Sequence, residues 1–170
     1  MPKKLRNKVT IITGGAQGIG KAAAEVFALN GAKVVIWDIN EEKGRQTEEE
    51  YSKAGLTISF AVVDTTKFDV VCTAAKKVIE EFGKIDILIN NAGIARDASL
   101  LKMTLDQWQQ VIDVNLTGVF NCTKAIAPFM VGRKNGRIIN TSSLIGMYGS
   151  DIGQTNFAAA KSGVVGITKV

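Results

Sequence analysis

Histidine is absent from this 170-residue sequence, and the only cysteines are Cys72 and Cys122. A zinc site or a histidine-based acid–base mechanism is therefore not expected, and two scattered cysteines argue against a disulfide framework. No apolar run approaches the ~20 residues of a membrane-spanning helix, and the amino-terminal start lacks the apolar core of a secretion signal. We expect a cytoplasmic protein that holds no metal and does not contact a membrane.

Aromatic residues make up only 6% of the chain and do not interleave with basic residues, so nothing indicates a stacking platform for nucleic acid. The net charge of +5 is spread along the sequence, and an anionic partner or an ordinary solvated surface would explain it equally well. No repeat or linker divides the chain. Its length predicts a single domain, residues 1–170, with a full-sized core.

The most informative stretch is the glycine-rich turn Thr13–Gly20, which contains Gly14, Gly18 and Gly20 and follows the apolar run Val9–Ile12. The apolar residues after the turn recur at helical spacing and are Ile19, Ala22, Ala23, Val26 and Phe27. A strand, a glycine turn and a helix in succession place free backbone N–H groups where a phosphate can bind. Turns also collect glycine simply because it tolerates a positive φ.

A second apolar strand, Lys33–Trp37, follows the helix and ends in Asp38. Together these elements form a βαβ unit with an acid at the end of its second strand. A carboxylate at that position can accept hydrogen bonds from both hydroxyls of an adenosine ribose. Alternatively, Asp38 caps the helix that starts near Glu41.

The rest of the chain continues this alternation. Helices are predicted over residues 41–54 and 67–82, from Thr104 to about Met130 and from about Thr155, and strands over 57–63, 85–89 and 136–141. Such a pattern predicts an α/β fold of the Rossmann type, a doubly wound parallel sheet with helices on both faces. The polar segments that follow its strands would meet in one crevice. They are Thr13–Gly20, Asp38, Asp64, Asn90–Gly93 and Ser142–Ser143.

Asn115 falls within the apolar stripe of the long fourth helix. A buried amide is costly unless it finds hydrogen-bond partners. Asn115 is therefore either a core residue bonded to a neighbouring main chain or a site residue, and the sequence leaves both readings open.

The pattern Thr-Gly-x-x-x-Gly-x-Gly, with an acid at the end of the second strand, resembles that of the short-chain dehydrogenase/reductase family, and the resemblance covers all 170 residues. Within the family the chain is most similar to 3-oxoacyl-(acyl carrier protein) reductases, through the segments Gly136–Ser143 and Gly153–Lys161. The family pattern continues past the last helix. The chain is thus expected to be truncated at its carboxyl end relative to the family, inside that helix.

The resemblance implies functions for individual residues. Cofactor-binding residues are expected in the glycine turn and after the second, third and fourth strands, and they are Gly14, Gln17, Gly18, Ile19, Gly20, Asp38, Asp64, Asn91, Ala92 and Gly93. Asn115 would anchor a proton-relay water, and Ser143 would hold the substrate carbonyl. Lys161 would bind the nicotinamide ribose.

One position departs from the family pattern, which has Tyr-x-x-x-Lys on the last helix, whereas this chain has Phe157 and Lys161. The two residues share a helix face, but phenylalanine can neither donate nor accept a proton. Loss of a positioned proton donor slows a reaction by roughly 10²–10⁴-fold. The resemblance therefore implies an impaired reductase of 3-oxoacyl thioesters, carried on coenzyme A or acyl carrier protein. The alternatives are a related alcohol or sugar dehydrogenase and a non-catalytic dinucleotide-binding or assembly module.

Charge at the end of the second strand predicts the cofactor. Asp38 would repel the 2′-phosphate of NADP(H), so we expect NAD(H) to bind at least tenfold more tightly, which corresponds to about 1.4 kcal/mol. Residues 15–17 of the turn carry no charge. Lys43 and Arg45 would reach back to the turn only if their helix packed unusually close.

The resembling family forms dimers through its long fourth helix and its last helix. In this chain the long helix carries more large apolar residues than one sheet face needs, and these are Val119, Phe120, Ile126 and Phe129. We therefore expect a homo-oligomer built from dimers.

Overall fold

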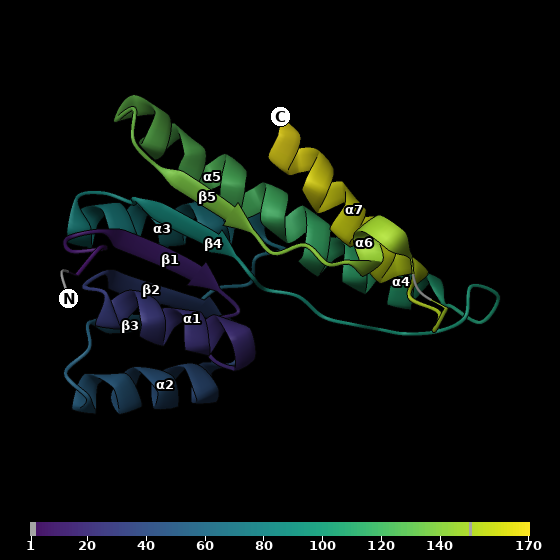
Figure 1. Cartoon of the computed structure of the whole chain (residues 1–170), viewed down its shortest axis with the longest axis horizontal. Helices are drawn as coiled ribbons and strands as arrows, with labels where there is room; N and C mark the ends of the chain where they lie inside the picture. The colour runs from purple at the N-terminus through teal and green to yellow at the C-terminus, as the bar shows by residue number, and fades with distance from the viewer. Residues whose placement is uncertain (1–2, 150) are drawn as a thin grey trace.

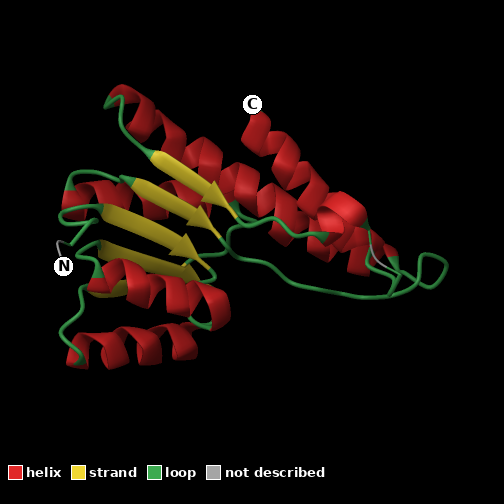
Figure 2. Ribbon diagram, viewed as in Figure 1, coloured by secondary structure: helices red, strands yellow, loops and turns green. Residues whose placement is uncertain are grey.

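The computed structural model describes residues 3–149 and 151–170, and it shows a parallel sheet flanked by helices (Figure 1, Figure 2). In chain order the elements are β1 (Val9–Thr13), α1 (Gly18–Leu29), β2 (Lys33–Asp38), α2 (Glu41–Lys53), β3 (Ile58–Val62), α3 (Phe68–Phe82), β4 (Ile87–Asn90), α4 (Leu105–Ile112), η1 (Asp113–Thr117), α5 (Gly118–Gly132), β5 (Arg137–Asn140), α6 (Ile145–Tyr148) and α7 (Thr155–Lys169).

All neighbouring strands pair in parallel, in the order β3-β2-β1-β4-β5. Figure 2 shows their arrowheads at one edge of the sheet, from which the loops to α1 and α4 leave. Because the strand order reverses between β1 and β4, a crevice opens between the carboxyl ends of these two strands. The predicted α/β sheet is confirmed, and each predicted strand is present with its ends within two residues of the expectation.

Two apolar clusters cover the two faces of the sheet. One packs Ala24 and Ala28 of α1 and Tyr51 of α2 against the sheet. The other packs residues of α3 and α5, among them Val71 and Ile126, against the opposite face. The sheet therefore has helices on both faces, as the alternation of elements predicts.

The buried face of α1 differs from the predicted apolar stripe. Ile19 and Val26 are 76% and 55% exposed, whereas Gly20, Ala24 and Ala28 are buried. A face of small residues lets the helix axis approach the sheet closely, with Phe27 packed at its margin, whereas Ile19 and Val26 stay exposed. Here the size of the side chains, rather than their hydrophobicity, sets the orientation of the helix.

The long fourth helix is continuous but changes its winding in the middle. A capping box of Thr104 and Gln107 starts α4 as predicted. The π-helical segment η1 then separates α4 from α5. Two residues on which the predicted oligomer interface was based, Val119 and Ile126, are buried within the chain itself, at 4% and 0% exposure. These two residues are not available to an oligomer interface, because Ile126 belongs to the core cluster on the sheet and Val119 is buried within the chain, while the homo-oligomer itself stays a prediction.

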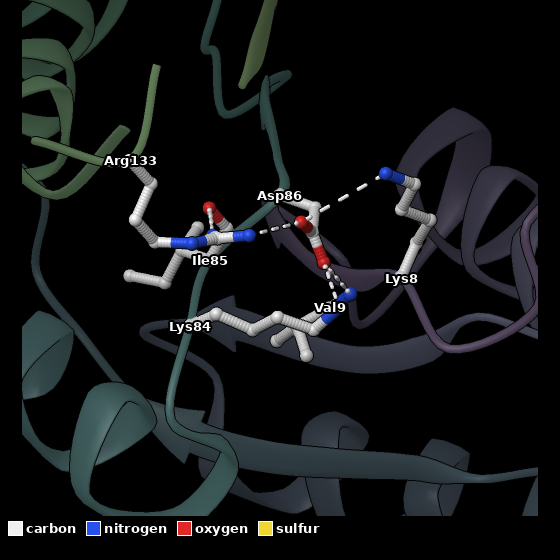
Figure 3. Close-up of polar contacts among 6 residues, drawn as sticks. All are labelled: Lys8, Val9, Lys84, Ile85, Asp86 and Arg133. Carbon is white, nitrogen blue, oxygen red and sulfur yellow. Dashed lines mark hydrogen bonds and ion pairs between the residues drawn. The ribbon is translucent and has the colours of Figure 1, made fainter. Parts of the chain in front are cut away.

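At the amino edge of the sheet, Asp86 is 3% exposed and surrounded by cations (Figure 3). Its carboxylate accepts from the Val9 N–H at 2.9 Å and pairs with Lys84 at 3.0 Å and Arg133 at 3.1 Å, while Lys8 lies at 3.9 Å. Burial works to raise the pKa of Asp86, but the Val9 N–H, Lys84 and Arg133 hold it below the ordinary value. This carboxylate ties the start of β1 to β4 and to the end of α5.

Over residues 3–149 and 151–170, no helix combines the length and the apolar character that a bilayer crossing requires. In the same residues, no group of three or more metal-ligating side chains comes together.

Candidate functional site

A cavity of about 370 Å³ opens where the carboxyl ends of β1, β2 and β4 meet. Eight of the predicted cofactor-binding residues line it, and these are Gly14, Gln17, Ile19, Asp38, Asp64, Asn91, Ala92 and Gly93. Gly18 and Gly20 lie in the first turn of α1, beside the lining residues. The structure thus brings these eight residues together, although they come from four segments at the carboxyl ends of β1, β2, β3 and β4, while Lys161 is not among the lining residues.

The side-chain amide of Asn91 and the hydroxyl of Thr13 join the glycine turn to the loop after β4. Asn91 Nδ2 donates to the carbonyls of Thr13 at 3.0 Å and Gly14 at 3.2 Å. The N–H groups of Asn91 and Ala92 both donate to Thr13 Oγ1 at 3.0 Å. Gly14 and Gly15 donate their N–H groups to the Trp37 carbonyl. These hydrogen bonds connect the cavity walls without involving the backbone N–H groups of the first turn of α1.

The amino terminus of α1 faces this cavity without a cap. Gln17 is the N-cap residue, its side chain makes no capping hydrogen bond, and the first turn contains no acid. The first N–H groups of a helix have no partner within the helix, and the helix dipole adds positive potential there. At Gly20 a side chain would overlap the Gly14 carbonyl, so glycine permits the tight turn. This arrangement suits a phosphate or pyrophosphate.

Asp38 lies at the end of β2 and lines the cavity. Its carboxylate accepts from the Ala16 N–H at 3.1 Å and from the Asn40 N–H at 3.0 Å. The cap of α2 is not Asp38 but Asn40, whose side chain accepts from the Lys43 N–H at 3.0 Å. The alternative interpretation of Asp38 as a helix cap is therefore wrong, and the carboxylate instead braces the glycine turn.

The structure corrects the expectation that Lys43 lies too far from the turn. Lys43 Nζ donates to Gln17 Oε1 at 2.6 Å. A cation thus stands next to a residue that lines the cavity. Arg45 does not reach the turn, because it pairs with Glu41 on its own helix at 2.7 Å.

Two other predicted residues have their polar atoms engaged locally. Asp64 Oδ1 accepts from the N–H and the hydroxyl of Thr66, at 2.9 and 2.7 Å. Asn115 is fully buried, and its side chain both accepts from the Ile94 N–H at 2.8 Å and donates to the Ile94 carbonyl at 2.9 Å. These bonds are those expected of a core amide bonded to a main chain, and the role of Asn115 as a site residue stays a prediction. The Asn115 side chain fixes Ile94, which lines the cavity.

Ser143, Phe157 and Lys161 lie outside the lining of this cavity, on the segment after β5 and on α7. Lys161 is 5% exposed, donates to the Thr141 carbonyl at 2.6 Å and lies 5.6 Å from the centre of the Phe157 ring. Burial lowers the pKa of its ammonium group. Ser143 Oγ accepts from the Ile145 N–H at 3.3 Å. The pairing of Phe157 with Lys161 on one helix face is as predicted.

Sequence reasoning missed Asn156, which is fully buried beside Phe157. Its side chain donates to the carbonyls of Arg96 and Gln107 at 3.0 Å and accepts from the Phe157 N–H at 2.8 Å. It thereby holds the loop after β4 and the helix α4 against the first turn of α7. A polar residue next to an apolar stripe was the only signal that could have indicated it.

The family model described as short chain dehydrogenase matches residues 8–170. The chain belongs to this family. The predicted resemblance to the short-chain dehydrogenases is thereby confirmed, and this family is one of oxidoreductases.

Several relatives match nearly the whole chain. The 3-oxoacyl-[acyl-carrier-protein] reductase FabG of Chlamydia muridarum (strain MoPn / Nigg) is 45% identical, with 99% of this chain and 68% of the relative covered. The reductase of the same name from Thermotoga maritima is also 45% identical, covering 98% and 67%. A third relative at 45% identity is the (2S)-[(R)-hydroxy(phenyl)methyl]succinyl-CoA dehydrogenase subunit BbsD of Thauera aromatica, covering 97% and 66%.

Among solved structures, the crystal structure of gox2181 superposes with a TM-score of 0.93 at 35% identity, covering 97% of this chain and 66% of the other. The short-chain dehydrogenase chain therefore spans about two thirds of the length of the proteins that it matches.

Proposed function

We propose that this chain is the dinucleotide-binding part of a reductase that converts a 3-oxoacyl thioester to its 3-hydroxy product. The observation that carries the proposal is the cavity at the β1–β4 crevice, in which the uncapped start of α1, Asp38 and the Asn91–Gly93 loop converge. These groups fit the pyrophosphate and the adenosine ribose of a nicotinamide dinucleotide. A thioester substrate is supported by the names of the relatives, which refer to thioesters of acyl carrier protein and of coenzyme A.

Each residue group would have one task. The free N–H groups of the first turn of α1 would hold the pyrophosphate, and Asp38 would accept from the ribose hydroxyls. Lys161 would bind the nicotinamide ribose, and Ser143 would hold the substrate carbonyl by donating its hydroxyl proton. When bound, the reduced nicotinamide supplies the hydride. Asn115 would anchor a proton-relay water through its main chain in η1, because its side chain is already hydrogen-bonded to the main chain of Ile94.

Protonation of the substrate oxygen is the step for which this chain lacks the residue that the family pattern provides. At the position where family members carry tyrosine, the ring of Phe157 has no ionisable group, and the ammonium group of the buried Lys161 lies 5.6 Å from its centre. We infer that reduction is slowed by roughly 10²–10⁴-fold relative to a tyrosine-containing site. Hydride transfer would remain possible.

Cofactor binding and the substrate assignment can be tested separately. Fluorescence titration with NADH and NADPH is expected to show that NADH binds at least tenfold more tightly, because Asp38 repels a 2′-phosphate. Phe157→Tyr, made in the parent chain, is expected to accelerate reduction of acetoacetyl thioesters by the same 10²–10⁴-fold. No reduction above background by that variant would refute the substrate assignment.

A non-catalytic dinucleotide-binding or assembly module is the second candidate, and the observation that favours it is Phe157 itself. Single-turnover mixing of substrate with pre-bound NADH distinguishes the two. Tight cofactor binding with no hydride transfer at all would support the module.

A further inference from the structure

Helix α2 contacts both β3 and the glycine turn. Gly44 faces the ring of Phe60, and a side chain at Gly44 would overlap that ring. Thr47, which is buried, donates its hydroxyl to the Ala16 carbonyl at 3.0 Å. The absence of a side chain at Gly44 therefore lets α2 lie close to β3, and the Thr47 hydroxyl connects α2 to the glycine turn.

The ammonium group of Lys43 lies beside Gln17, one of the residues that line the cavity, although Lys43 itself is not among them. The Lys43 backbone is fixed by the Asn40 side chain at the start of α2, and its Nζ reaches Gln17 Oε1 at 2.6 Å. Gln17 and Asp38 both line the cavity. Among the ion pairs of residues 3–149 and 151–170, none involves Lys43. The ammonium group of Lys43 is thus hydrogen-bonded to a neutral amide, and its positive charge remains available to an anion.

We propose that Lys43 is a specificity-determining residue that gives this site residual affinity for dinucleotides carrying a 2′-phosphate. The inference rests on the proposed dinucleotide function of the cavity and adds to it. Asp38 disfavours a phosphate that bears about two negative charges, while Lys43 can exchange its bond to Gln17 for a charge-assisted bond to that phosphate. NADH has no phosphate there, so Lys43 contributes little to its binding. The expected preference for NAD(H), at least tenfold in the unmodified chain, would therefore be larger still without Lys43.

The test is a fluorescence titration of NADH and NADPH into the unmodified chain and three variants. Lys43→Met is expected to weaken NADPH about tenfold and to change NADH less than about twofold. Lys43→Arg retains the charge and is expected to keep NADPH within about threefold of the parent. Arg45→Met removes a cation from the same helix that does not reach the turn, and it is expected to change neither affinity.

Salt provides a readout that a merely structural effect of Lys43 would not give. NADPH binding by the parent is expected to weaken more steeply between low and physiological ionic strength than NADPH binding by Lys43→Met, because the exposed pair is screened. Equal weakening of both cofactors by Lys43→Met, or no effect on NADPH, would overturn the inference while leaving the proposed function intact. If neither cofactor binds to the unmodified chain, the proposed function and this inference both fail.

Discussion

Asp86 allows a quantitative test of what holds the sheet together. Its carboxylate is buried at the amino edge, far along the strands from the cavity, and three cations and one backbone N–H depend on it (Figure 3). Asp86→Ala would leave the Val9 N–H without its acceptor and would place Lys84 and Arg133 beside an empty buried space. Removing one partner of a buried ion pair costs about 3–5 kcal/mol.

For a chain of this length, that cost corresponds to a fall in melting temperature of about 6–20 °C. Asp86→Asn retains an oxygen for the Val9 N–H and loses only the charge, so we expect a smaller loss of about 1–3 kcal/mol. Urea unfolding monitored by circular dichroism measures both values. Asp106→Asn, on an exposed carboxylate in the first turn of α4, is the matched control, with an expected loss of about 0.3–1 kcal/mol from the helix dipole.

The pH dependence gives a second readout of the same residue. Because the folded-state pKa of Asp86 is depressed, its contribution to stability is fully present above the pKa of the unfolded chain, about 3.9, and is lost as pH falls through the folded value. The stability difference between the parent and Asp86→Asn is thus expected to narrow below about pH 4. A loss smaller than about 1 kcal/mol for Asp86→Ala at pH 7 would refute the reasoning, since it lies well under the cost of a broken buried pair.

Two further substitutions test the site and its surroundings. Asn115→Ala leaves both polar groups of the Ile94 main chain without their side-chain partner, and we expect the free energy of unfolding in urea to fall by about 2–4 kcal/mol. Dinucleotide binding is expected to weaken as well. A loss of stability with unchanged binding would show that Ile94 does not shape the cavity. Lys161→Met removes a buried ammonium group whose pKa is lowered by burial. At pH values between that lowered pKa and the unfolded value of about 10.4, the unfolded chain binds more protons than the folded chain. The free energy of unfolding of the parent is therefore expected to rise relative to that of Lys161→Met as pH increases through this window. Parallel pH profiles of stability for the two proteins would contradict the expectation.

The sheet and the cofactor edge could be predicted because their signals are local. Apolar runs, helical spacing and the glycine turn identified every strand and brought Asp38 and the Asn91–Gly93 loop to one cavity. The buried face of α1 could not be predicted from hydrophobicity, because the close approach of Gly20, Ala24 and Ala28 to the sheet favours small residues over large apolar ones.

Other features depended on distances between elements. The reach of Lys43 to the glycine turn follows from the contact of Gly44 with the Phe60 ring, which joins two elements and leaves no trace in the spacing of either one. Asn115 could be placed in the long helix from the spacing of its apolar residues, but its partner Ile94 lies in another segment and could not be identified from that spacing. Asn156 escaped notice because its partners, Arg96 and Gln107, are distant in sequence.

The hydroxyl of Thr13 has a consequence for how the chain acquires its binding competence. It joins the end of β1 to residues 78 and 79 positions later, at the end of β4. Contacts of such long sequence separation form late, because the intervening loop must be closed first. An emerging chain that has completed only its first βαβ unit therefore possesses the glycine turn and Asp38 but not the walls that follow β3 and β4. A dinucleotide would then bind only to the completed sheet, and it would shift the folding equilibrium towards that state by mass action.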